Sequence, residues 1–142
     1  MKKIFLSIGA LILIVTMSFF ILSTTHQKKS LTNEVLQDIN FSKIQANTLI
    51  TEKDKIYKIK PDDSNNLIKN LKLINVKKSK KPKIENYNIL TFSGPGGSFQ
   101  IFLYKDQYIK IPTKDTDSFY KIIETNKSEK INQIINKISK NK

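Results

Sequence analysis

The chain has 142 residues and a formal net charge of +13, because 25 basic residues, all of them Lys, outnumber 12 acidic ones. It contains no Cys, which excludes disulfides, lipid attachment through a thiol and cysteine-based nucleophilic chemistry. A chain of this length holds one small domain beyond a targeting segment, and its basic surface attracts polyanions.

The first 22 residues predict membrane targeting. The run Ile4–Leu22 follows Lys2 and Lys3 and carries no charge. As a helix rising ~1.5 Å per residue, this run comes close to spanning the ~30 Å hydrocarbon core of a bilayer. It is longer than the usual core of a signal peptide, and no Ala-x-Ala cleavage pattern follows it. We therefore expect a retained single span, with secretion after signal cleavage as the alternative.

The orientation of this span is less sharply determined, because Lys2 and Lys3 before it are balanced by Lys28 and Lys29 after it. The short basic start, followed at once by the apolar run, favours a cell-membrane protein whose C-terminal domain lies outside. There the available polyanions are wall polymers and lipid headgroups, so no nucleic acid is expected as a partner. With the opposite orientation, nucleic acid would return as a candidate.

The chain divides into three parts by composition. We expect residues 1–27 to form the membrane anchor or signal peptide with a short linker, residues 28–38 a juxtamembrane segment, and residues 39–142 an extracytoplasmic α+β domain. The spacing of apolar residues over 30–39 permits a short helix at the entry to the domain.

Two strands and a helix are predicted next. The segments 41–50 and 55–60 have the alternation of paired strands, with Ile44, Ala46, Thr48 and Ile50 on one face of the first. Pro61-Asp62-Asp63-Ser64 is typical of a helix start. The helix is predicted over 63–73, and its apolar face contains Leu67, Ile68, Leu71 and Ile74.

The lysine run, residues 77–83, is too charged and too close to Pro82 to continue that helix, so we expect a loop. Each Lys near an anionic membrane surface contributes about 1 kcal/mol of attraction. A solvated loop is the simpler interpretation of the run, and contact with a polyanion is the functional one. The polyanion-binding candidates are Lys77, Lys78, Lys80, Lys81 and Lys83.

The C-terminal half predicts an antiparallel meander followed by a helix. Strands are expected over 86–92, 99–104 and 108–112, and Gly94–Gly97 forms the tip of the first hairpin. Residues 118–124 fit a helix or a strand equally. From Ser128 the chain predicts a helix whose Ile stripe either closes the core or is offered to a partner; the stripe comprises Ile131, Ile134, Ile135 and Ile138.

The predicted fold class is therefore α+β, with an N-terminal transmembrane helix followed by a small antiparallel-sheet domain, one helix packed on that sheet and a C-terminal helix. The core is expected between the meander and the helix over 63–73.

Catalytic constellations are missing from the sequence. His26, which is the only His, lies in the linker, and the acid pairs Asp62/Asp63 and Asp115/Asp117 fit helix starts. Gly94–Gly97 lacks the Lys-Ser/Thr of a nucleotide loop. We therefore predict no catalytic residues, no metal site and no cofactor.

The order of several segments resembles a family of short exported proteins of unknown function from low-GC Gram-positive bacteria. The resemblance extends from about Ile39 to Ile123. It is carried by the Ile-rich paired strands, the Leu67–Leu71 helix, the Lys-rich link ending in Pro82, Asn86-Tyr87-Asn88-Ile89, Tyr104–Pro112 and Phe119-Tyr120-Lys121-Ile122. It implies an envelope-located α+β domain and supplies no catalytic residues.

The function predicted from these features is a membrane-anchored, non-enzymatic binding domain whose basic surface contacts anionic wall polymers or lipid headgroups. Tyr87, Tyr104 and Tyr108 are the candidates for partner contact. Two alternatives remain: an immunity or inhibitor-type protein that binds another envelope protein, and a carboxylate-based hydrolase using Asp62 or Asp106.

Overall fold

The computed structural model describes residues 28–105, 107–112 and 117–140. The predicted membrane segment, the linker with His26, and the acids Asp106 and Asp115 lie outside these ranges, so the expectations placed on them stay predictions. Within the described ranges, no helix has the length and apolar character needed to cross a membrane.

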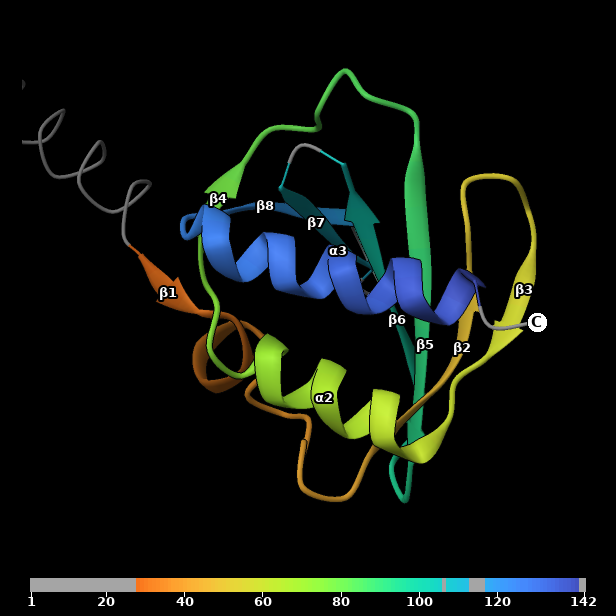
Figure 1. The fold of residues 1–142 in the computed structure, drawn as a ribbon. Coiled ribbons are helices and arrows are strands. Elements are labelled where there is room, and N and C mark those ends of the chain that lie inside the picture. The colour runs from red at the N-terminus through yellow and green to blue at the C-terminus, as the bar shows by residue number, and fades with distance from the viewer. Residues whose placement is uncertain (1–27, 106, 113–116, 141–142) are drawn as a thin grey trace, which may run out of the picture.

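The domain is built on one antiparallel sheet of eight strands in the order β1-β4-β8-β7-β6-β5-β2-β3 (Figure 1). Consecutive hairpins form its centre, from β5 to β8. The strands are β1 (Lys29–Ser30), β2 (Gln45–Ile50), β3 (Ile56–Lys58), β4 (Asn75–Ser79), β5 (Tyr87–Gly94), β6 (Gly97–Tyr104), β7 (Tyr108–Pro112) and β8 (Asp117–Ile122). This sheet confirms the α+β class and the predicted meander.

Two α-helices, α2 (Pro61–Leu71) and α3 (Thr125–Lys140), lie side by side across one face of the sheet (Figure 1). A short π-helix, η1 (Leu31–Val35), follows β1. Both helices predicted for the domain are therefore present, and the C-terminal one also packs on the sheet. No helix formed by the described residues covers the other face of the sheet.

The core fills the space between the helices and the covered face of the sheet. Leu67 and Leu71 of α2 are fully buried, and so are Leu90 and Ile101 at the centre of the sheet. The Ile stripe of α3 closes this core rather than facing outward; its buried members are Ile131, Ile135 and Ile138.

The prediction that Ala46, Thr48 and Ile50 share one face of β2 was wrong, because a β-bulge interrupts the alternation of side chains along the strand. Ala46 lies opposite Phe92 and Thr48 lies opposite Thr91, so one residue between them is extra. Such an insertion moves every later side chain to the other face of the sheet. Ala46 and then Leu49 are therefore buried, while the side chain of Thr48 faces away from the core.

The prediction that the whole lysine run is a loop was also wrong. Lys77 and Lys78 belong to β4, which pairs with β8 in a register that places Val76 opposite Ile122. Val76 alone anchors β4 in the core, because the long Lys side chains can reach solvent from a strand near the rim of the sheet. The same pairing resolves residues 118–124, which mostly form a strand.

Residues 29–36 are packed as part of this domain. β1 pairs with β4, and the Leu31 N–H donates to the Ile74 carbonyl over 3.1 Å. Leu31 is fully buried and Leu36 nearly so. Most of the predicted juxtamembrane segment, residues 28–38, is therefore packed as part of the domain.

The polar residues at the start of α2 contact distant elements instead of capping their own helix. Lys60 is the N-cap and makes no side-chain cap hydrogen bond. The buried Ser64 hydroxyl accepts the Ala46 N–H over 2.7 Å, and Asp63 pairs with Lys137 of α3 at 2.7 Å. These contacts tie α2 to both β2 and α3.

Candidate binding groove on the open sheet face

The sheet face that carries no helix, called the open face below, is unusually rich in aromatic and basic side chains. Strand alternation and the register that pairs Ile89, Phe102 and Lys110 across neighbouring strands define its members. An antiparallel sheet with one solvent-facing side normally turns polar residues outward. Here the open face of β5 to β8 includes Tyr87, Ile89, Phe102, Tyr104, Tyr108, Lys110, Phe119 and Lys121.

Four aromatic rings of this face, those of Tyr87, Phe102, Tyr104 and Phe119, form one connected cluster. The centroid of Tyr87 lies 5.2 Å from that of Phe102 and 5.3 Å from that of Tyr104. Tyr104 in turn lies 6.4 Å from Phe119. All three pairs are tilted or edge-on, which is the geometry that aromatic quadrupoles favour.

Two lysines hold their charges over aromatic rings of the open face. Lys110 Nζ lies 4.0 Å from the ring centroid of Phe102 and 3.2 Å from a carboxylate oxygen of Asp117. Lys121 Nζ lies 5.6 Å from the ring centroid of Tyr108. Cation–π attraction therefore fixes positive charge directly above the aromatic surface.

A groove of about 660 Å³ forms where the segment 80–86, which connects β4 to β5, borders this cluster. This volume lies within the range of sites that hold small molecules or polymer segments. The groove is lined by three lysines, three aromatic residues, two acids and two apolar residues: Lys81, Lys83, Lys110, Tyr87, Tyr104, Phe119, Glu85, Asp117, Pro82 and Ile84.

The groove unites residues that the sequence offered as two separate candidate sets. Lys81 and Lys83 of the lysine run share its lining with Tyr87 and Tyr104. Tyr108 lies beside the groove, directly opposite Tyr104 on the neighbouring strand.

The remaining lysines of the run are spread around the groove rather than inside it. Lys77 lies opposite Lys121 on the open face, whereas Lys78 alternates to the covered face opposite Tyr120. Lys80 is exposed at the start of the connecting segment.

Sequence reasoning missed Lys110 and Phe119 as site residues. Lys110 alternates with the buried Ile109 and Ile111, so a strict strand alternation would have placed it on the open face. Phe119 could not be placed while residues 118–124 fitted a helix equally well.

The environment of Tyr104 keeps its phenol neutral. Burial raises the pKa of Tyr104 above its usual value, and the nearby Tyr87 and Asp117 raise it further. A neutral phenol both donates and accepts a hydrogen bond. The groove therefore offers ammonium groups, flat apolar rings and a neutral hydroxyl side by side.

Among the described residues, Asp62 and Asp63 do not form a catalytic pair. Asp62 is exposed, while Asp63 is bound to Lys137. In the described part of the chain, no group of His and acidic residues could hold a metal ion.

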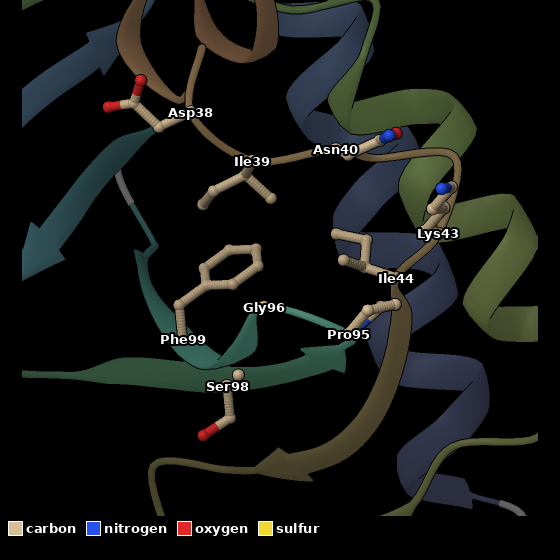
Figure 2. A pocket seen from close by; sticks show the side chains of 10 residues that line it. Asp38, Ile39, Asn40, Lys43, Ile44, Pro95, Gly96, Ser98 and Phe99 are labelled. Atoms are coloured by element: carbon tan, nitrogen blue, oxygen red, sulfur yellow. The ribbon is translucent and has the colours of Figure 1, made fainter.

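A second cavity, of about 260 Å³, lies between residues 38–44 and the β5–β6 hairpin. Figure 2 shows Ile39, Ile44 and Phe99 directed toward one another, whereas the polar groups of Asp38 and Ser98 point away from them. Without convergent polar groups, this cavity lacks the features that orient a ligand. Pro95, Gly96 and Gly97 line it, and Gly94–Gly97 forms the hairpin turn that the sequence predicted.

Comparison with models of protein families, with curated proteins and with solved structures found no match for the chain.

Proposed function

We propose that this protein is a membrane-anchored, non-enzymatic binding domain that lies outside the cell membrane and holds an anionic polymer of the cell envelope in the groove. The observation that best supports this proposal is the joint lining of one groove by Lys81 and Lys83 on one side and by Tyr87, Tyr104 and Phe119 on the other.

The chemistry of the groove suits a polymer that alternates anionic groups with polyol or sugar units. Lys ammonium groups act as strongly hydrated point charges that bind phosphate. The aromatic rings offer flat surfaces to the C–H faces of the intervening units, and the Tyr hydroxyls can bond their oxygens. Glu85 can accept hydrogen bonds from hydroxyl groups of the same polymer, whereas Asp117 is occupied by Lys110.

A protein partner is the second candidate, and a separate feature favours it. The open face continues beyond the groove as an aliphatic patch, in which Ile50 of β2 lies between Ile89 of β5 and Ile56 of β3. Ile56 is 71% exposed on the edge strand. An inhibitor or immunity-type protein would use such an apolar surface against another envelope protein.

The decisive test is a titration of the full chain, held in nanodiscs of zwitterionic lipid, with soluble poly(glycerol phosphate). In one variant Lys81→Gln and Lys83→Gln are combined. In the matched control Lys130→Gln and Lys140→Gln remove the same charge from exposed positions on α3, on the other side of the sheet.

We expect the Lys81/Lys83 variant to bind about 30-fold more weakly at low salt, since two lysines at about 1 kcal/mol each amount to roughly that factor. The Lys130/Lys140 variant should change the Kd by about twofold or less, because its charges lie far from the groove. Equal weakening in both variants would show that net charge attracts the polymer and that the groove does not bind it.

A further inference from the structure

Two of the three large apolar side chains that are exposed among the described residues lie at the same end of the domain. Leu73 is 52% exposed and Ile123 is 40% exposed, whereas Ile56, at 71%, lies on the far edge strand. The Ile123 N–H donates to the Asn75 carbonyl over 3.0 Å, which places Ile123 beside the turn that contains Leu73.

Both residues lie in connections, where polar side chains are usual. Leu73 follows the last turn of α2, and Ile123 follows β8 directly before α3. Lys127 Nζ donates to the Leu73 carbonyl over 2.5 Å and so holds the two connections together. Isolated exposed apolar residues are common on proteins, so their meaning depends on what else lies at this end.

The chain enters the domain at this end. β1 starts at Lys29 and pairs with Asn75 and Val76 of β4, beside the C-terminal end of α2 and the N-terminal end of α3 (Figure 1). Only residues 23–28 separate Lys29 from Leu22, the last residue of the apolar run. Seven Cα–Cα steps connect Leu22 to Lys29, so even a fully extended chain reaches no more than about 25 Å. A bilayer holding the apolar run therefore lies close to Leu73 and Ile123.

The charges at this end suit a membrane surface. Lys28, Lys29 and Lys72 are exposed there. Two acids lie nearby: Lys28 pairs with Glu124 at 3.3 Å, and a carboxylate oxygen of the exposed Glu34 accepts the Ser30 N–H over 2.8 Å. Exposed apolar residues framed by lysines are the pattern by which proteins lie in the interface of an anionic bilayer.

We propose that this end of the domain docks on the outer surface of the bilayer. Leu73 and Ile123 enter the boundary between headgroups and acyl chains, while Lys29 and Lys72 contact anionic headgroups. This proposal rests on the membrane anchor of the proposed function and not on the groove. The groove lies on the open sheet face, so docking leaves it accessible to polymers of the envelope.

The absence of Cys from the chain allows a test by single labelled positions. Three variants of the full chain, Leu73→Cys, Ile123→Cys and Ile56→Cys, each carry one environment-sensitive fluorophore. They are reconstituted into nanodiscs that contain phosphatidylglycerol and a lipid with a nitroxide in its upper acyl chain. Ile56→Cys is the matched control, because Ile56 is an exposed apolar residue on the opposite edge of the sheet.

We expect the nitroxide to quench the labels at positions 73 and 123 at least about twofold more than the label at position 56. Replacing phosphatidylglycerol by phosphatidylcholine should weaken this quenching, because the lysines then lose their partners. Equal quenching at all three positions, or none at 73 and 123, would overturn the proposal. The emission of these labels in detergent could instead change with protein concentration. That result would overturn the proposal, because it would mean that Leu73 and Ile123 contact a second copy of the chain.

The same samples test the docking surface separately from the membrane anchor and from the polymer-binding groove. Retention of the chain in nanodiscs through a high-salt wash reports on the anchor, and polymer titration reports on the groove. Loss of quenching with both of those intact means that the docking surface alone is wrong.

Discussion

Glu124 joins three elements at the end of the domain where the chain enters, and its replacement by Gln tests how that junction is stabilised. One carboxylate oxygen accepts the Asn75 N–H over 3.0 Å, and the other accepts the Asn75 side-chain amide over 2.7 Å. Lys28 pairs with it at 3.3 Å. The carboxylate therefore connects the start of β4, the start of α3 and the residue before β1.

The size of the effect follows from the pKa of Glu124. Burial alone would raise this pKa, but the hydrogen bonds from Asn75 and the charges of Lys28 and Lys127 outweigh burial and lower it from 4.5 to about 2. Each pKa unit corresponds to about 1.4 kcal/mol, so the ionised form contributes about 3 kcal/mol to folding. The side chains of Lys28 and Glu124 are 57% and 20% exposed, so solvent screens part of this interaction and the expected loss is smaller than that figure.

We expect Glu124→Gln to lower the free energy of unfolding at pH 7 by about 2 to 3 kcal/mol, measured by urea denaturation of the full chain in a neutral detergent. Because the folded pKa lies below the unfolded value, this stabilisation is complete above about pH 5 and is lost as the pH falls toward 2. The wild-type protein and the variant should therefore converge in stability near pH 2.

The matched control is Glu129→Gln, which removes the same charge from an exposed position in α3. Its free energy of unfolding should stay within about 0.5 kcal/mol of the wild type. Equal losses in the two variants, or a gap between wild type and Glu124→Gln that does not narrow below pH 4.5, would refute this account of Glu124.

Three further stability predictions can be checked by the same urea denaturation. Ser64→Ala leaves the buried Ala46 N–H without its 2.7 Å acceptor and should cost about 1 to 3 kcal/mol, whereas Ser64→Thr, which keeps the hydroxyl, should cost less if the lost bond is the cause. Gly94→Ala places a Cβ 2.8 Å from Ile44 Cγ2 and should cost about 1 to 3 kcal/mol, while Gly96→Ala meets nothing within 4 Å and should be nearly neutral. Glu52→Gln breaks the exposed 3.0 Å pair with Lys105 and should change stability by less than about 0.5 kcal/mol, so a larger loss would mean that the pair is not merely a surface contact.

The elements that could be predicted from the sequence are those whose side chains repeat with one clear period. The Ile residues of α3 recur at 3 and 4 positions, and the meander alternates around Gly94–Gly97, so both were placed close to their observed bounds.

What could not be predicted depends on pairing between distant segments. β4 has one core residue, Val76, followed by two lysines, and only its pairing with β8 makes it a strand. The bulge in β2 has no sequence signature, yet it exchanges the faces of Thr48 and Leu49. Local pattern does not contain this information, because strand pairing is set by the whole sheet.

The candidate site, too, was only partly predictable from the sequence. Lys81, Lys83, Tyr87 and Tyr104 were all proposed from residue type, but as two unrelated sets. These residues meet in one groove because the sheet has the strand order β4-β8-β7-β6-β5. In this order the segment 80–86, which connects β4 to β5, borders the open face next to β6, β7 and β8. The groove is therefore a product of topology rather than of any motif.

The proposed function requires that the groove itself holds the anionic polymer. The most direct measurement is NMR of the full chain in zwitterionic micelles, with 13C-labelled aromatic rings, during titration with poly(glycerol phosphate). We predict that the ring signals of Tyr87, Tyr104 and Phe119 shift together and saturate with one Kd, while the signals of Tyr57 and Phe99 on the covered face remain unchanged. Shifts of similar size on both faces, or shifts confined to residues outside the groove, would contradict the claim.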